Sequence, residues 1–290
     1  MITRPNVKVN LGLNVLRRRE DGYHDIETLF VPSYECSDTL EIIAGDDWSR
    51  TSARLSGLYD ASSGQISQAI SEDGKLMITI ARKEGVDWDP LSDLTAKAYR
   101  LLDGEFGLGS VKIFLEKTSP VGAGLGGGSA DAAFALRMLS ELFELGLSDD
   151  TLSAYASKLG SDCAFFVWNR PMIGEGRGEI LSEYALEGID FGGNEGGGYV
   201  LKLVVPEGMA VSTAEAYRGI CPGMPEIPLR EALARPVEQW KDCLVNDFEK
   251  TVFVLHPELA AIKASLYEAG AVYAGMSGSG SALFAIYRKA

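Results

Sequence analysis

The clearest hydrophobic pattern in the chain is a strict alternation over residues 7–15, VKVNLGLNV. Every second position is apolar, and the positions between them carry polar residues or glycine, among them Lys8 and Asn10. A period of two predicts a β-strand, on which Lys8 and Asn10 point to the same face, about 6.6 Å apart. The pattern alone leaves two interpretations of that face, a solvated outer surface or a pair of functional side chains.

Similar patterns predict the other elements. Apolar residues at helical spacing, with capping residues at the ends, predict helices over 92–103, 129–145, 149–159, 212–218 and 257–269. Apolar runs predict strands over 111–117, 164–168 and 199–205 and a terminal hairpin over 271–289. Polar and glycine-rich composition predicts irregular or hairpin structure over 43–75 and a domain junction over 187–200. Helices and strands that mix without regular alternation predict the α+β class.

Length, charge and cysteine content narrow the class of protein. A chain of 290 residues is long enough for two domains. The net charge of −14 argues against nucleic acid or an anionic membrane as a partner, because both require a basic face, but it permits an anionic small molecule. Four scattered cysteines and two histidines predict reduced thiols and no Cys/His metal site. The absence of a signal-peptide pattern and of any apolar run of transmembrane length predicts a cytoplasmic protein.

The segment SPVGAGLGGGSADAAFALRML (119–139) places five glycines within the seven positions from Gly122 to Gly128. The glycines follow a predicted strand and run directly into a predicted helix. Glycine is costly to order, so this density indicates that a ligand approaches the backbone closely. A strand, glycines and a helix N-terminus form an anion site, because N–H groups and the positive end of the helix dipole converge there. The segment therefore predicts a phosphate-binding loop, with a flexible linker as the alternative.

The segment matches the known classes of phosphate-binding loop to different degrees. A Walker A loop requires Lys followed by Ser or Thr after the last glycine, and here Ser-Ala follows instead. A Rossmann GxGxxG motif is satisfied literally by Gly122, Gly124 and Gly127, and would make the chain an NAD-dependent oxidoreductase. Its context is poor, because the polar stretch 116–120 separates the strand from the first glycine.

PVGAGLGGGSADAA (120–133) resembles the phosphate loop of the GHMP kinases, which include galactokinase and the homoserine, mevalonate and phosphomevalonate kinases. Two more segments resemble motifs of that family in the expected order, the opening strand VKVNL (7–11) and the late glycine loop GMSGSGSALF (275–284). Further segments resemble the branch that acts on a cytidine diphosphate-linked methylerythritol: RREDGYHDIETLF (18–30), GGGSADAA (126–133), LGSDCAFF (159–166) and LVNDFE (244–249). The DGYH turn is the most diagnostic of them.

The resemblance implies a two-domain GHMP kinase fold, with a ribosomal-protein-S5-like domain over 1–186 and a ferredoxin-like domain over 187–290. It also implies ATP- and Mg²⁺-dependent phosphorylation of the 2-hydroxyl of the methylerythritol unit, a step of non-mevalonate isoprenoid precursor synthesis. The expected partner is this small molecule, and the oligomeric state is left open. Other hypotheses are a homoserine- or mevalonate-type GHMP kinase and a catalytically inactive relative, against which the presence of both Lys8 and Asp162 argues.

The resemblance also implies roles for individual residues. Asp162 would be the base that takes the hydroxyl proton, and Lys8 would contact that carboxylate and the reacting oxygen; from the sequence alone, Asp162 is equally well a helix N-cap. Tyr23 would stack on the cytosine and His24 would bind its edge, although an aromatic–His pair in a turn is often a packing feature. Asn10 would also bind the substrate, and metal ligands are not indicated. The residues expected at the ATP phosphates are Pro120, Val121, Gly122, Ala123, Gly124, Leu125, Gly126, Gly127, Gly128, Ser129 and Ala130.

Overall fold

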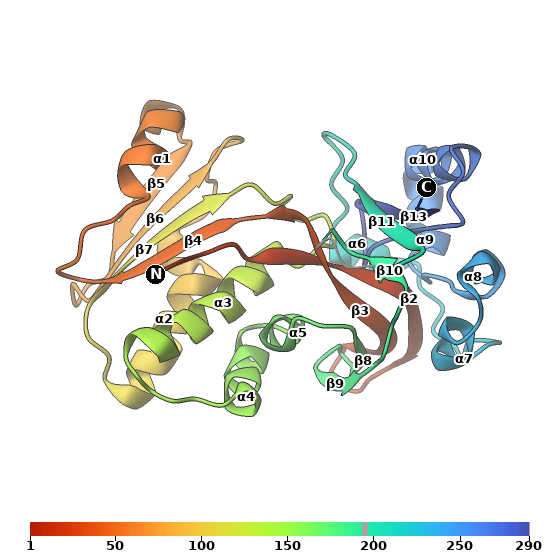
Figure 1. Cartoon of the computed structure of the whole chain (residues 1–290), viewed down its shortest axis with the longest axis horizontal. Coiled ribbons are helices and arrows are strands. Elements are labelled where there is room, and N and C mark those ends of the chain that lie inside the picture. The colour runs from red at the N-terminus through yellow and green to blue at the C-terminus, as the bar shows by residue number, and fades with distance from the viewer. Residues whose placement is uncertain (193–196, 290) are drawn as a thin grey trace. The chain divides into compact units, whose positions relative to one another are not determined.

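The computed structural model of the chain describes residues 1–192 and 197–289. It contains two compact units, each built from stretches that are far apart in the sequence (Figure 1). Unit 1 consists of Met1–Asn6, Cys36–Ser119 and Gly126–Trp168, and unit 2 of Val7–Glu35, Pro120–Leu125 and Asn169–Ala290. The domains expected at 1–186 and 187–290 are instead continuous segments of the chain. That division differs from the two compact units and stays a prediction.

Unit 1 is built on a sheet with the strand order β1-β4-β7-β6-β5. Within it β6 and β7 are parallel, and the other neighbours are antiparallel. Its strands are β1 (Ile2–Thr3), β4 (Thr39–Ala44), β5 (Ile66–Ile70), β6 (Leu76–Arg82) and β7 (Val111–Lys117). Its helices are α1 (Ser52–Leu58), α2 (Leu94–Phe106), α3 (Gly127–Leu142), α4 (Asp149–Leu159) and α5 (Cys163–Trp168), with the 3₁₀ turns η1 (Ala61–Ser63) and η2 (Pro90–Ser92). This mixed sheet is not the mostly parallel sheet of a dinucleotide-binding fold, so the Rossmann-type alternative is wrong.

The two faces of β7 contact different helices. Glu116 accepts a hydrogen bond from the hydroxyl of Tyr59, which directly follows α1 (3.0 Å). The next residue, Lys117, forms an ion pair with Asp131 on α3 (2.7 Å). Because successive strand residues point to opposite faces, one face of β7 is turned to α1 and the other to α3, which packs side by side with α2 (Figure 1).

Unit 2 contains two sheets in its described residues, with the strand orders β2-β3-β8-β9 and β10-β11-β13-β12. The strands are β2 (Asn6–Arg18), β3 (His24–Ser37), β8 (Met172–Gly176), β9 (Ile180–Glu183), β10 (Ile189–Asp190), β11 (Tyr199–Val204), β12 (Tyr273–Met276) and β13 (Leu283–Arg288). The helices are α6 (Thr213–Arg218), α7 (Leu229–Leu233), α8 (Trp240–Cys243), α9 (Glu249–Leu255) and α10 (Pro257–Glu268), with the 3₁₀ turn η3 (Val237–Gln239). One core cluster contains Leu29 of β3, Phe284 of β13 and Trp240 of α8, so both sheets contribute to the same core.

Both faces of β2 are buried along its first ten residues. Val9 and Leu11 belong to the hydrophobic core, as the alternation predicts. Lys8 and Asn10, on the other face, are only 3% and 2% exposed. The interpretation of this face as a solvated surface is therefore wrong. Because these polar groups are buried, they require hydrogen-bond partners within the chain.

The structure corrects two of the predicted elements. Residues 164–168 form a helix, α5, and not a strand. The run AFFVW is buried on nearly all sides, and a short apolar run without periodicity cannot distinguish a buried strand from a buried helix. The stretch 43–75, expected to be irregular or a hairpin, contains the helix α1, which was not expected, whereas its strand β5 forms an antiparallel hairpin with β6. Within 187–200, the structure describes β10 and the start of β11, and residues 193–196 of that predicted junction lie outside the described part.

The other predicted helices and strands are confirmed with small shifts of their ends. The phosphate loop is followed by α3, which begins at Gly127, two residues before the predicted start. The terminal hairpin is present as the antiparallel pair β12 and β13.

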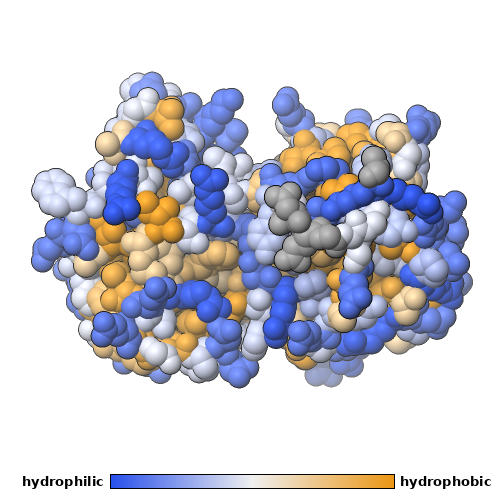
Figure 2. Space-filling model, in the orientation of Figure 1, coloured by the Kyte–Doolittle hydropathy of each residue, from blue (hydrophilic) through white to orange (hydrophobic). Residues whose placement is uncertain are grey.

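On the face drawn in Figure 2, hydrophilic side chains separate the hydrophobic patches. Within the described ranges, no helix combines the length and hydropathy needed to cross a membrane.

Candidate active site

Lys8 and Asn10 form a buried polar cluster with the glycine loop inside unit 2. The Lys8 Nζ donates to the Asn10 Oδ1 (2.5 Å) and to the carbonyl oxygen of Gly124 (2.8 Å). The Lys8 backbone N–H donates to the carbonyl of Leu125 (2.9 Å), and the Asn10 Nδ2 donates to the hydroxyl of Thr28 (3.0 Å). A buried ammonium group needs such acceptors to offset its lost hydration. These contacts place the Lys8 charge directly beside the loop.

The late glycine loop packs against the first half of the phosphate loop, also within unit 2. Gly124 has a φ of 76°, and a Cβ added there would lie 2.3 Å from the carbonyl oxygen of Ser277. The Ser277 hydroxyl donates to the Gly124 carbonyl (3.2 Å), and the Ala282 N–H donates to the Ala123 carbonyl (3.1 Å). Glycine at 124 is thus required by both the backbone angle and the close approach.

The remaining residues at the start of the loop differ in their exposure. Pro120 is half-buried, Val121 is 49% exposed, and Gly122 is exposed with a φ of 72°. Ala123 and Leu125 are buried. Within this first half of the loop, residues 123–125 are anchored by their contacts with Lys8 and the late glycine loop, whereas residues 121–122 are exposed.

The second half of the loop belongs to unit 1 and forms the N-terminus of α3. Gly126 has a left-handed φ of 71° and directly precedes the helix. Gly127 and Ala130 are buried, Ser129 is half-buried, and Gly128 is exposed. The first N–H groups of a helix have no partner within it and attract anions, so the expected phosphate residues 127–130 coincide with this turn.

Asp162 lies in the turn between α4 and α5, close to the start of α3. The thiol of Cys163 interacts with residues at both places. Burial raises the pKa of this thiol to about 11; a hydrogen bond with Ser129 opposes the rise, and the charge of Asp162 adds to it. An added Cβ on Gly160 would lie 3.2 Å from the Cys163 Sγ and 3.9 Å from the Ser129 Oγ. Asp162 is half-buried. Within unit 1 the expected base and the expected phosphate residue Ser129 are therefore neighbours.

The DGYH turn packs against an aromatic side chain of α6 that sequence reasoning missed, Tyr217. The Tyr23 N–H donates to the Asp21 Oδ1 (3.1 Å), and the Tyr23 side chain is 57% exposed. The His24 ring stacks on Tyr217 of α6, with 4.7 Å between ring centroids and 18° between planes. Burial, assisted by the charge of Arg18, lowers the pKa of His24, so its imidazole is neutral at pH 7. Tyr217 gives no periodic signal in the sequence, because only the tertiary fold brings it to position 24.

Asp93, the N-cap residue of α2, makes its hydrogen bonds within the protein. Its Oδ1 accepts hydrogen bonds from the N–H and the hydroxyl of Thr95 (2.9 and 2.7 Å), which caps α2. Its Oδ2 accepts a hydrogen bond from the indole of Trp88 (3.2 Å). In the part of the chain that the structure describes, no group of three or more His, Cys, Asp and Glu side chains is arranged to hold a metal ion.

Comparison with known proteins agrees with this arrangement of motifs. The family model described as GHMP kinases N terminal domain matches residues 93–170, and the one described as GHMP kinases C terminal matches residues 229–290. The chain is 44% identical over 290 residues to the 4-diphosphocytidyl-2-C-methyl-D-erythritol kinase of Bacteroides fragilis, with 99% of this chain and 92% of that protein covered. A protein of the same name from Parabacteroides distasonis is 41% identical over 289 residues, with 100% and 92% covered. The chain belongs to the GHMP kinases and, within them, to the family of 4-diphosphocytidyl-2-C-methyl-D-erythritol kinases.

Solved structures support the same fold. A 4-(cytidine 5'-diphospho)-2C-methyl-D-erythritol kinase matches with a TM-score of 0.72 and 31% identity, covering 98% of this chain and 89% of that one. A homoserine kinase from Cytophaga hutchinsonii matches with a TM-score of 0.65 and 15% identity, covering 98% and 86%, which is a likeness of fold alone. The expected α+β class and GHMP kinase fold are confirmed.

Proposed function

We propose that this chain transfers the γ-phosphoryl group of ATP to the 2-hydroxyl of 4-diphosphocytidyl-2-C-methyl-D-erythritol, a step of non-mevalonate isoprenoid precursor synthesis. The observation that carries the proposal is the 44% identity, along nearly the whole chain, to a relative of that name. Kinase activity on a small molecule follows from membership of the family. A cytoplasmic location and a domain boundary after residue 186 remain predictions from the sequence.

Phosphoryl transfer requires mainly positioning and charge stabilisation. In the proposed mechanism, Asp162 accepts the proton of the 2-hydroxyl as its oxygen bonds to the γ-phosphorus, and the bond to the bridging oxygen of ADP breaks. The Lys8 ammonium stabilises the negative charge on the transferred group. The contact of Lys8 with the Gly124 carbonyl supports this role, because it puts the charge at the expected phosphate loop.

ATP would bind with its phosphates along Pro120–Ala130, where the backbone N–H groups of the loop and of the first turn of α3 are donors. Mg²⁺ usually binds through one or two protein oxygens together with nucleotide phosphates, so no dedicated cluster of protein ligands is needed. The Ser129 hydroxyl, at the start of α3, is an oxygen that fits this use. When bound, Mg²⁺ would neutralise charge on the phosphate oxygens.

The cytidine end of the substrate would be held at the DGYH turn. Tyr23 has an exposed ring that can stack on a base. A neutral His24 offers one donor and one acceptor to the edge of cytosine. Tyr217 holds the plane of the His24 ring by stacking on it. Asn10, whose side chain is already oriented by Lys8 and Thr28, would contact the methylerythritol part.

An ADP-release assay with a panel of acceptors tests this function. We expect kcat/KM for 4-diphosphocytidyl-2-C-methyl-D-erythritol to exceed that for homoserine, galactose or mevalonate by at least about 100-fold, since those alcohols leave the base-binding groups unpaired. Efficient turnover of one of the small alcohols, without turnover of the cytidine compound, would keep the kinase class and overturn the substrate.

A further inference from the structure

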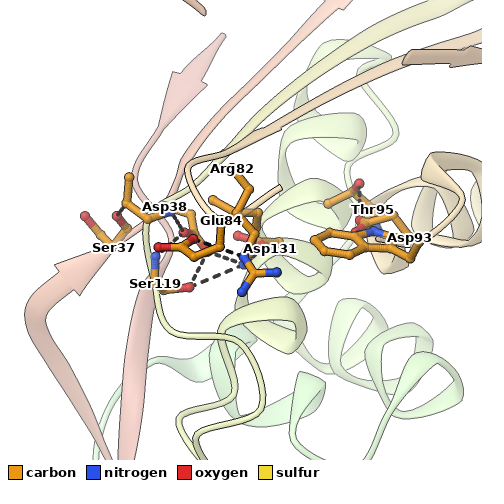
Figure 3. A network of polar contacts seen from close by, with 11 residues as sticks. Ser37, Asp38, Arg82, Glu84, Asp93, Thr95, Ser119 and Asp131 are labelled. Carbon is orange, nitrogen blue, oxygen red and sulfur yellow. Dashed lines mark hydrogen bonds and ion pairs between the residues drawn. The ribbon is translucent and has the colours of Figure 1, made fainter. Parts of the chain in front are cut away.

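The entrance to the glycine loop contains a buried ionic cluster that the proposed mechanism does not use. It consists of Asp38, which lies between β3 and β4, Lys117 at the end of β7, and Asp131 in the first turns of α3. Their side chains are 1%, 4% and 2% exposed. Figure 3 shows Asp131 on its helix, directed toward Asp38 and Ser119. All these residues belong to unit 1.

The cluster holds the backbone on the entry side of the loop. The Asp38 Oδ1 accepts hydrogen bonds from the N–H groups of Thr118 and Ser119, both at 2.7 Å. The Asp38 Oδ2 accepts one from the Ser119 hydroxyl (2.6 Å) and another from the Lys117 Nζ. Two residues that lead into the loop are therefore fixed by a single carboxylate.

The same cluster holds the exit side of the loop. The Lys117 Nζ also donates to the Asp131 Oδ2 (2.7 Å), which connects the end of β7 to α3. A Cβ added to Gly127 would lie 2.5 Å from the Ser119 Oγ and 3.5 Å from the Lys117 Nζ. The last residue before the loop and the first residue of α3 are thus in direct contact, and Lys117 bridges them from the side of the sheet.

The charges of the cluster are unequal, because two carboxylates surround one ammonium group. Burial alone lowers the pKa of Lys117, but the charges of Asp131 and Asp38 outweigh it and raise the pKa, so Lys117 stays protonated. Burial raises the pKa of Asp131 well above its ordinary range, against the opposing effect of Lys117. Among the described residues, the Oδ1 of Asp131 has no hydrogen-bond partner. A neutral side chain of the same shape at 131 is therefore compatible with the site.

We propose that Asp38, Lys117 and Asp131 are positioning residues for ATP. By joining Ser119 to the first turn of α3, they set the distance between the two ends of the loop and the direction of the N–H groups that would bind the phosphates. The proposal rests on the proposed function insofar as the loop binds ATP. It does not depend on the identity of the phosphate acceptor.

The test compares two variants of neighbouring residues on β7. Lys117→Met removes the bridge, and Glu116→Gln changes a buried group on the opposite face, which contacts Tyr59 and Arg54 of the α1 segment. Both variants are expected to lower the melting temperature. Lys117→Met is expected to weaken ATP binding, measured by calorimetric titration without acceptor, by about 10- to 100-fold, because misplacement by about 1 Å has effects of that size. Its affinity for the cytidine substrate, and the ATP affinity of Glu116→Gln, are expected to stay within about threefold of the wild type.

Two variants of Asp131 keep the proposal testable if Lys117→Met does not fold. Asp131→Asn preserves the shape and the bond to Lys117 and is expected to bind ATP within about threefold of the wild type. Asp131→Ala is expected to lose the affinity that Lys117→Met loses. Folded Lys117→Met and Asp131→Ala variants that bind ATP as the wild type does would overturn the positioning role. A wild-type chain that binds ATP but does not phosphorylate the cytidine compound would overturn the proposed substrate and leave the positioning role standing.

Discussion

Asp162 is the residue on which the proposed chemistry depends most. Asp162→Asn keeps the shape of the side chain and removes its basicity, so we expect kcat to fall by about 10²-fold or more while the Kd for ATP stays nearly unchanged. Asp150→Asn, at an exposed position near the start of α4, is the matched control and should leave kcat unchanged. Steady-state kinetics with a parallel ATP titration measures both. An Asp162→Asn variant with wild-type turnover would remove this residue from the role of base.

Tyr23 tests the recognition of the nucleobase. Its ring is 57% exposed, and the Arg177 guanidinium lies 5.0 Å from the ring centroid. Tyr23→Ala is expected to weaken binding of the cytidine substrate by about 1–3 kcal/mol, the contribution of one base–aromatic stack. ATP binding should be retained. Trp48→Ala, which removes a ring that is 94% exposed in unit 1, is the control. Equal losses in the two variants, or no loss in Tyr23→Ala, would place the cytosine elsewhere.

His24 makes a prediction about pH. Because its pKa is lowered in the folded chain, from an ordinary value of 6.5, protonation favours the unfolded chain. The contribution of His24 to stability is present above pH 6.5 and is lost as the pH falls through the lowered pKa. NMR titration of the ring in a His256→Gln background should show a midpoint below 6.5. A midpoint at or above 6.5 would mean that the ring in solution is less buried than the stack with Tyr217 requires.

At the scale of elements, the late glycine loop makes glycine indispensable at one position of the phosphate loop. Gly124→Ala and Gly122→Ala share the cost of a left-handed backbone, about 1–2 kcal/mol. Only at 124 would the new methyl group also collide with the Ser277 carbonyl, whereas a Cβ at 122 meets no described atom within 4 Å. Gly124→Ala should therefore lower the free energy of unfolding more than Gly122→Ala does, as measured by denaturant titration. Equal losses would show that the close approach at Ser277 relaxes without cost.

The elements also show where reasoning from the sequence succeeds. The alternation over 7–15 predicts β2 correctly, because strand residues alternate between two surroundings even when both are buried. It cannot say that the face of Lys8 is buried, since that depends on residues 124–125 and 277. The run 164–168 is misjudged as a strand because all five of its residues are apolar, and such a run shows neither the strand period nor the helix period.

For the whole molecule, the order of the motifs along the chain predicts the GHMP kinase fold, because three glycine-rich or strand motifs in sequence are specific together. The interleaving of the two units is not predictable from any local pattern. The same holds for the stacking of His24 on Tyr217 and for the bridge from Lys117 to Asp38, which join residues 193 and 79 positions apart. Such contacts depend on topology, and composition and periodicity do not report on it.

The most direct measurement of the central claim is the position of the phosphate in the product. The purified chain would be incubated with Mg-ATP and 4-diphosphocytidyl-2-C-methyl-D-erythritol, and the product examined by ³¹P NMR. We expect a new phosphomonoester signal that shows no three-bond coupling to a proton, because carbon 2 of the methylerythritol unit carries no hydrogen, together with one equivalent of ADP. The same unit without its cytidine part should react far more slowly, because the remote base supplies binding energy for positioning. Phosphorylation at another hydroxyl, or equal rates with and without the cytidine part, would contradict the assignment.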